Sequence, residues 1–299
     1  MPRLASLLCV LVFAAPAASE EAGGPVELRL KFTPGEAFDV ETTTITESET
    51  AAGPLTILSL MTQRMTRRET VLSVAGDGSA TVRDVLTRVR ASNEMIGLPA
   101  PVEQEWDSDS GEAPPEQLSP IANRYRPLIG AERTYTMRPD GTATDFRLSE
   151  GYKAAVRSLP GMADATDEDI ASGPYGGVNG TVVLPPGPVR VGDVWEDERS
   201  EAASDATIGK QTFTGFDAAG LAVIKGDYEV KLPDADDEAG GFSVEDSSGT
   251  VETLFDVQAG RIPKTTMTIE MTLRMKFGGQ ETRPKSKTTI EAVRTPVTQ

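Results

Sequence analysis

The sequence predicts a mainly β (α+β) protein in which long antiparallel strands form a curved sheet or incomplete barrel, with two or three short helices. Three observations predict this class: strict alternation of apolar and polar residues over 266–277, further long extended stretches joined by glycine turns, and helical spacing in short stretches only. Successive side chains of a strand point to opposite faces, so strict alternation indicates one buried face and one wet face.

The stretch 266–277 is the centre of this prediction. Its apolar positions are Met267, Ile269, Met271, Leu273, Met275 and Phe277, and every residue between them is polar. Gly278-Gly279 then indicates a two-residue hairpin turn, because glycine takes a positive φ without steric cost. Folding back at this turn pairs Glu270 with Lys287, Lys276 with Glu281, Ile290 with Met267, and Thr288 with Ile269. The two opposite-charge pairs support this register on the wet face.

A preceding strand completes a three-strand meander over 249–294. Val251, Phe255 and Val257 alternate with other residues in the same way. They share the apolar face if Gln258-Ala259-Gly260 is a three-residue loop, in which Gly260 takes the left-handed position.

A long hairpin is expected in the N-terminal half, with arms at 55–75 and 80–91 and a turn at 76–79. Its second arm does not alternate cleanly, because Val82 and Val85 have opposite parity. Either a bulge shifts the register or both faces are partly covered. Other expected strands are 26–32, 38–46, 134–138, 142–146, 206–216 and 221–232.

Two stretches favour helices. Ser119 as N-cap and Pro120 at the first helical position mark the first. The second begins near Ser149 and ends at Pro160-Gly161, and 166–170 adds one more turn. Its apolar residues follow helical spacing at Tyr152, Ala155, Val156 and Leu159.

Residues 1–19 are expected to be a signal peptide. Arg3 supplies the positive start, 4–15 is a short apolar run, and small residues before Ser19 fit a cleavage site. No run is long enough for a transmembrane helix, so an integral membrane protein is not expected. The mature chain is expected in the periplasm or outside the cell, as a single β-rich domain over 20–299. Its halves, 26–175 and 188–295, look loosely alike, which suggests an ancient duplication.

Composition excludes several function classes. The formal net charge is −17, which repels nucleic acid, so no nucleic-acid partner is expected. The chain has no histidine, and its one cysteine, Cys9, leaves with the signal peptide. Ser-His-Asp and Cys-His catalysis are therefore excluded, as are zinc sites built on histidine or cysteine. No cofactor is expected.

Two kinds of site remain open by composition. Carboxylate-pair hydrolysis needs two acidic groups roughly 5 to 9.5 Å apart in one cleft. Ca²⁺ binding has two candidate loops, one with Asp107, Asp109 and Glu112 and one with Asp234, Asp236, Asp237 and Glu238. Neither loop has the spacing of an EF-hand, so solvated loop charge is the preferred explanation.

The apolar face of 266–277 is the leading candidate binding site. Methionine adapts to ligands of varied shape, so a concave sheet lined by Met267, Met271, Leu273, Met275 and Phe277 suits a lipid or a lipoprotein segment. The alternative is that this face is core beneath the helices, where methionine is common filler. The expected function is a non-enzymatic envelope protein. The competing hypothesis is a structural or protein-interaction module with a solid core and no ligand.

Four short motifs carry a resemblance to known proteins. Pro188–Trp195 is PVRVGDVW, Pro139-Asp140-Gly141 turns a hairpin before it, and Phe255-Asp256 and Gly260-Arg261 follow it. Together they resemble a family of exported bacterial proteins with no assigned function, which implies fold and export but supplies no site residue. The general plan is also similar to LolA-type lipoprotein carriers, whose curved, incomplete barrel holds acyl chains. This similarity is one of fold alone.

Overall fold

The computed structural model describes residues 24–52, 55–98, 100–159, 161–172, 182–196, 205–231, 242–277 and 280–297. The expected signal peptide, the turn at 278–279 and the acidic loop at 234–238 lie outside these ranges. The strands are β1 (Ala37–Ala52), β2 (Leu55–Val74), β3 (Ala80–Ile96), β4 (Val102–Asp107), β5 (Glu132–Met137), β6 (Ala143–Leu148), β7 (Val194–Glu196), β8 (Asp205–Phe216), β9 (Ala222–Lys231), β10 (Phe242–Asp256), β11 (Arg261–Phe277), β12 (Gln280–Thr282) and β13 (Lys285–Pro296).

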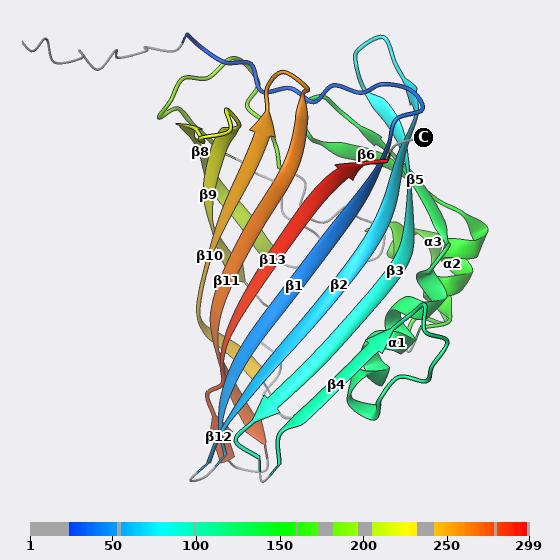
Figure 1. Cartoon of the computed structure of the whole chain (residues 1–299), viewed down its shortest axis with the longest axis vertical. Coiled ribbons are helices and arrows are strands. Elements are labelled where there is room, and N and C mark those ends of the chain that lie inside the picture. The colour runs from blue at the N-terminus through cyan, green and yellow to red at the C-terminus, as the bar shows by residue number, and fades with distance from the viewer. Residues whose placement is uncertain are drawn as a thin grey trace, which may run out of the picture.

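These strands form one antiparallel sheet in the order β6-β5-β3-β2-β1-β13-β11-β10-β9-β8-β7, with β4 beside β3 and β12 beside β11. The order follows the chain except where β1 pairs with β13, so the first and last long strands lie side by side (Figure 1). The described strands thus form a meander around a barrel left open between β6 and β7. The predicted class, mainly β with a curved, incomplete barrel, is confirmed.

The β11–β13 ladder has the predicted register. Glu270 lies opposite Lys287, and Met267 lies opposite Ile290. The returning arm is two strands rather than one, because β12 ends before a break at 283–284 and β13 then begins. The sequence therefore predicted the register of the hairpin correctly, but it did not predict the break in its second arm.

The β10–β11 connection is one residue longer than predicted. The turn takes in 257–260, so that Asp256 pairs with Arg261 after a register shift at Phe255. Gly260 has φ +64°, the left-handed conformation expected of it. The extra residue, Val257, packs against the neighbouring apolar cluster instead of continuing the alternation.

A bulge in β3 explains the change of parity in that strand. Thr87 has no partner on β2, because the pairing passes from Leu86 directly to Arg88. Val82 and Leu86 are buried before the bulge, and Val89 is buried after it. Of the two explanations left open by the sequence, the bulge is correct, and it keeps the buried residues of β3, which include Asp84 and Asn93 as well as the apolar ones, on one face of the strand.

An apolar cluster closes the end of the sheet that holds the start of β3, which is the upper end in Figure 1. Segment 24–33 crosses this end, where the backbone N–H of Leu30 donates to Pro139 at 2.8 Å and that of Lys31 donates to Gly260 at 2.9 Å. The strand expected at 26–32 is extended, but its only described ladder contact is the bridge from Val26 to Val189. Its backbone groups bond to turns instead. The cluster contains Leu28, Leu30, Val71, Val82, Tyr135, Met137, Val182, Leu184, Trp195, Phe213, Ile224 and Phe255.

A second cluster lies between β3, β4 and the helices α1 (Ser119–Tyr125), α2 (Glu150–Arg157) and α3 (Asp167–Ser172). The helices and the extra turn are where the sequence places them. Ser149 caps α2 by accepting a hydrogen bond from the backbone N–H of Tyr152 at 3.1 Å. Ser119, predicted as N-cap, is instead the first residue of α1, with Leu118 at the cap. Among the described helices, none is long and apolar enough to cross a membrane.

Candidate functional site

The predicted ligand residues lie on the inner face of the sheet, which we define as the face that packs on the helices. Met267, Met271 and Leu273 are partly buried there. Met267 lies opposite the buried Val251, so β10 and β11 present apolar side chains on the same side. β11 continues to Phe277, but the side chains of Met275 and Phe277 are outside the described part of the structure. The binding role of these five residues remains a prediction.

Small side chains occupy the middle of this inner face. On β1 and β13 the inward residues of the lower half are Thr42, Thr44, Thr46, Ser48, Ser286, Thr288 and Ala292, with Ile290 the one larger member. Larger side chains lie on either side, namely Met61, Gln63 and Met65 on β2 and Met267, Ile269 and Met271 on β11. All of them are partly buried. Because Ser, Thr and Ala fill less space than methionine, we call this surface the inner trough. At its β2 edge, Met61 and Met65 also pack against the apolar cluster beneath the helices.

Charged residues border the inner trough at its upper end. In the next row of the ladder, Arg67 of β2 and Arg294 of β13 flank Val40 of β1. Arg67 Nη1 donates to Asp84 Oδ2 at 2.8 Å, and Arg294 Nη2 donates to Glu69 Oε2 at 2.5 Å. The trough therefore ends at guanidinium groups already held in place by carboxylates.

These ion pairs of Arg67 and Arg294, which we call the charged layer, continue into the protein interior. Asp84 also accepts from Arg133 Nε at 2.6 Å, and both side chains are at most 5% exposed. Burial alone would lower the pKa of Arg133, but the charge of Asp84, the hydrogen bond to it and the nearby Tyr152 and Tyr135 together outweigh burial, and the pKa is raised. Burial raises the pKa of Tyr135 well above its ordinary value, so its hydroxyl stays protonated and donates to Glu69 Oε1 at 3.3 Å.

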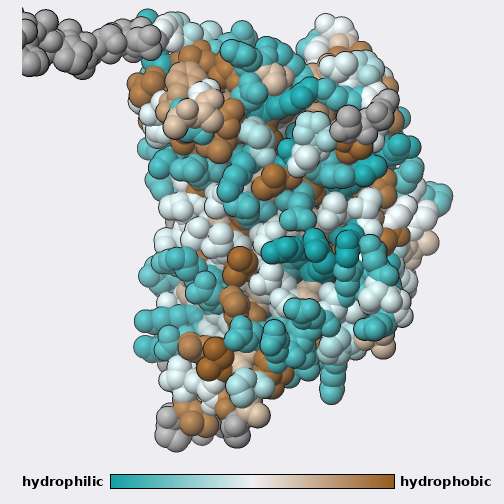
Figure 2. Space-filling view, in the orientation of Figure 1, coloured by the Kyte–Doolittle hydropathy of each residue, from teal (hydrophilic) through white to brown (hydrophobic). Residues whose placement is uncertain are grey.

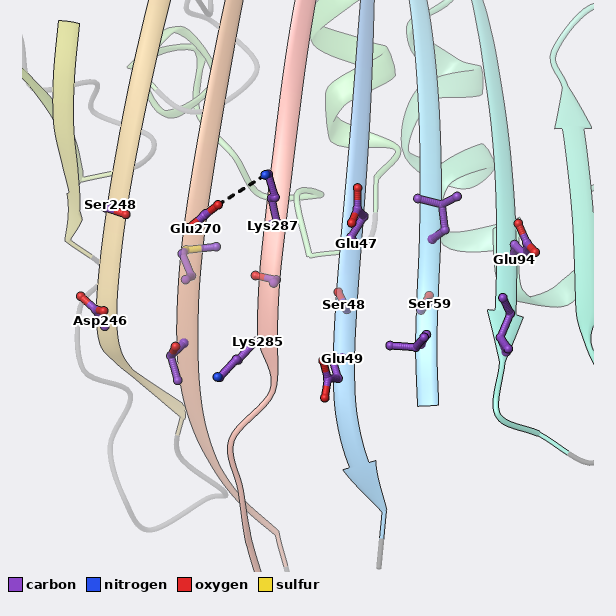
Figure 3. A pocket seen from close by; sticks show the side chains of 16 residues that line it. Glu47, Ser48, Glu49, Ser59, Glu94, Asp246, Ser248, Glu270, Lys285 and Lys287 are labelled. Atoms are coloured by element: carbon purple, nitrogen blue, oxygen red, sulfur yellow. Dashed lines mark ion pairs between the residues drawn. The ribbon is translucent and has the colours of Figure 1, made fainter. Parts of the chain in front are cut away.

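The opposite, outer face carries a hollow of about 600 Å³ in the lower part of the sheet (Figure 3). Two rows of side chains line it, and each residue lies directly opposite the next in its row. One row is Glu94, Leu60, Glu47, Lys287, Glu270 and Ser248. The other is Ile96, Leu58, Glu49, Lys285, Thr272 and Asp246. We call this surface the outer hollow. Four residues of inward parity also line it between the two rows, namely Ser48, Ser59, Ser286 and, of the predicted residues, Met271.

The outer hollow combines acidic and apolar surface. Five acidic side chains line it against two lysines, a formal balance of −3. One lysine, Lys287, pairs with Glu270 at 3.4 Å, as the sequence predicted. The β2–β3 side is apolar and open, with Leu58 46% exposed and Ile96 50% exposed. Figure 2, in the same orientation as Figure 1, shows hydrophobic side chains among hydrophilic ones in this lower part of the molecule.

The first acidic loop considered for Ca²⁺ is occupied by an arginine. Arg88 pairs with Asp107 and, at 3.3 Å, with Asp109. The hydrogen bond from Arg88 lowers the pKa of Asp107. In the ranges that the structure describes, no three His, Cys, Asp or Glu side chains gather into a metal-binding group.

No protein family matches the sequence, and no curated protein matches it. The resemblances noted above therefore rest on local motifs and on the general plan. Among solved structures, one of lipovitellin concerned with lipid–protein interactions is 9% identical, with a TM-score of 0.48, and covers 89% of this chain but 25% of that one. The present chain thus spans about a quarter of the lipovitellin chain it matches.

Two further solved structures are similar over most of their length. DynF from the dynemicin biosynthesis pathway of Micromonospora chersina is 9% identical, with 93% of this chain and 92% of that chain covered and a TM-score of 0.22. An outer-membrane channel from Pseudomonas putida F1 is 7% identical, with 91% and 99% covered and a TM-score of 0.26. Each of the three TM-scores is below 0.5, so these likenesses carry no argument about this chain.

Sequence reasoning located the apolar face of β11 but missed the outer hollow. A signal was present in β2, where Leu58 and Leu60 have one parity and Met61 has the other. Apolar residues on both parities indicate a strand with two apolar faces. Only the ladder to β1 and β3 shows which parity faces outward.

Proposed function

We propose that this protein is an exported, non-enzymatic envelope protein that holds an apolar ligand, a lipid or a lipoprotein segment, in its inner trough. The observation that carries the proposal is the difference in side-chain size across the inner face. Small side chains on β1 and β13 lie between methionines on β2 and β11, and the described side chains of this surface are only partly buried. The pattern of residues 1–19 supports export.

The inner trough differs from the packed interior above it. Phe255 and Ile224, on the same face of the sheet, are at most 1% exposed. Protein interiors are close-packed, and their large apolar side chains are normally sealed from water. Methionine walls that stay partly exposed beside a floor of small residues are more typical of a surface that adapts to a ligand.

The charged layer at the top of the inner trough gives such a ligand an orientation. Three guanidinium groups face two carboxylates there, an excess of one positive charge in a strongly acidic chain. Arg67 and Arg294 are each 24% exposed. An acyl chain would lie among the methionines, with a polar or anionic head directed toward these arginines.

The test is native mass spectrometry of the mature protein purified from its exported fraction, followed by solvent extraction and lipid analysis. We expect a stoichiometric apolar molecule in the wild type and its loss in Met267→Glu, since the new carboxylate has to be desolvated beside the acyl chain. The matched control is Thr268→Glu, which adds the same charge to the outer face of the same strand. The intact mass also reports cleavage near Ser19.

A clean apo mass, with no gain in melting temperature on adding lipids, would overturn the proposal. So would retention of the lipid by Met267→Glu with loss from Thr268→Glu, because that result would place the ligand on the other face of β11.

A further inference from the structure

We propose that the outer hollow is a docking site for an extended protein segment that carries several basic residues interleaved with apolar ones. This inference goes beyond the proposed function and is independent of it. The two rows of side chains that line the outer hollow lie on the opposite face of the sheet from the inner trough and have different chemistry, although Ser48, Met271 and Ser286 line both.

The shape of the outer hollow fits a short extended chain. Its two rows of side chains cross six strands, which at about 4.8 Å between neighbours gives a length of roughly 24 Å. The rows lie two residues apart along each strand, or about 7 Å. An extended peptide advances about 3.3 Å per residue, so roughly seven residues would span the hollow.

The charge of the outer hollow selects a basic partner. Carboxylates lie along its whole length, from Glu94 on β3, through Glu47 and Glu49 on β1, to Asp246 on β10. Glu103 on β4, directly opposite Glu94, extends the acidic surface beyond the hollow. Acidic groups spread over this length match several cations spaced along a chain better than one cationic headgroup. The same groups repel an anionic lipid or a nucleic acid.

The apolar side of the outer hollow indicates that the partner is not simply polybasic. Leu58, Leu60 and Ile96 are 38 to 50% exposed and adjacent, with Leu58 directly opposite Ile96. Exposed apolar patches rimmed by charged residues mark interaction sites. Leucine-like residues of the partner would pack here, while the stems of its lysines or arginines cover the same surface and direct their charges to Glu94 and Glu47.

The proposal is tested with a fluorescently labelled seven-residue peptide in which lysine alternates with leucine, titrated with the mature protein by anisotropy. We expect saturable binding that weakens as salt is added. A peptide with glutamate in place of lysine is expected not to bind, and one with serine in place of leucine to bind more weakly.

Protein variants locate the binding surface. The double variant Glu47→Gln/Glu94→Gln is expected to raise Kd about tenfold, because two exposed charge contacts are lost. Leu58→Ser/Ile96→Ser is expected to raise it by about the same factor. The matched control is Glu27→Gln, an exposed acid outside the hollow whose removal should leave Kd unchanged.

Three results would overturn the inference: both double variants bind like the wild type, the glutamate peptide binds equally well, or Met267→Glu abolishes peptide binding. The last result would place the peptide in the inner trough. Peptide binding that persists in Met267→Glu, together with loss of lipid from that variant, would separate the two sites. Absence of any bound lipid from the wild type would leave the peptide result standing, so the two proposals can fail separately.

Discussion

The inner face at the upper end of the sheet and the outer face at its lower end differ greatly in burial. In β2, the inward Val71 near the upper end is 4% exposed, whereas the outward Leu58 near the lower end is 46% exposed. In β3 the corresponding values are 4% for the inward Val82 and 50% for the outward Ile96. The inner face of the upper ends packs against segment 24–33 and against strands β8, β9 and β10, which together seal a core. In the described part of the chain, the lower ends have no such second layer on the outer face.

This difference shows that an apolar strand pattern indicates burial only where a second layer is present. Where it is absent, the same side chains form surface that is available for binding. We therefore expect stability to reside where the inner face is sealed and binding on the open surfaces of the lower half. The predictions below test this division, starting with the change expected to have the largest effect.

Deletion of Thr87 should abolish the difference between the sealed and the open parts of the sheet. Thr87 is the bulge residue of β3, so its loss restores simple alternation and turns Val89 and Ala91 away from the helices. We expect the deletion to cost about 5 kcal/mol or more, comparable with the whole stability of a typical domain. Loss of near-ultraviolet circular dichroism and of the cooperative melting transition would report it.

The matched control is a substitution at the same position, so the chain keeps its length and the bulge. Thr87→Ala removes only the hydrogen bond from the threonine hydroxyl to the carbonyl of Thr66, 2.9 Å long and exposed. Its expected cost is about 1 kcal/mol or less. A deletion variant that melts at the wild-type temperature would show that the lower half does not depend on this register.

Truncation of one apolar side chain at each end compares the halves directly. Phe255→Ala should lower the free energy of unfolding by about 4 kcal/mol, because Phe255 is fully buried and its loss leaves a cavity. Leu58→Ala should change it by less than about 0.5 kcal/mol, since the side chain is nearly half exposed. Urea denaturation at neutral pH measures both. Equal losses would mean that the outer face of the lower end is as well packed as the sealed inner face of the upper end.

The buried ion pairs belong to the stabilising half. Asp84→Asn leaves Arg67 and Arg133 without their shared carboxylate in a site where Asp84 is 2% exposed, so we expect a loss of about 3 kcal/mol. Asp39→Asn breaks the pair with Arg68, whose side chains are 37% and 45% exposed, and should cost less than about 1 kcal/mol. A similar cost for both, measured by urea denaturation, would contradict a difference based on burial.

Local chemistry explains the parts of the fold that the sequence predicted. The β11–β13 register follows from opposite charges at Glu270 and Lys287, and α2 follows from the capping hydroxyl of Ser149. The Thr87 bulge was one of two explanations that the parity of β3 allowed. Each of these features depends on residues that are close in sequence or joined by one short turn.

The remaining features depend on contacts between residues far apart in the chain. Pairing of β1 with β13 joins the first and last long strands, and no local pattern in either one specifies the other as its partner. Segment 26–32 alternates like a strand, yet its backbone bonds to turns at Pro139 and Gly260. The outer hollow likewise exists only because six strands from different parts of the chain align Leu58 with Glu49, Lys285 and Asp246.

Acid titration of an exposed ion pair should give the smallest effect. The hydrogen bond from Arg88 lowers the pKa of Asp107 in the folded state, against an ordinary value of about 3.9 in the unfolded chain. The ion pair therefore contributes its stability fully above about pH 4, and this is lost as pH falls through the lowered folded-state pKa. The difference in free energy of unfolding between the wild type and Asp107→Asn should be constant from about pH 7 to 5 and shrink below about pH 4. Urea denaturation across this range measures it, with Arg88→Gln expected to show the same trend from the other side of the pair. A difference that stays constant down to pH 3 would mean that the carboxylate of Asp107 does not contribute through its charge.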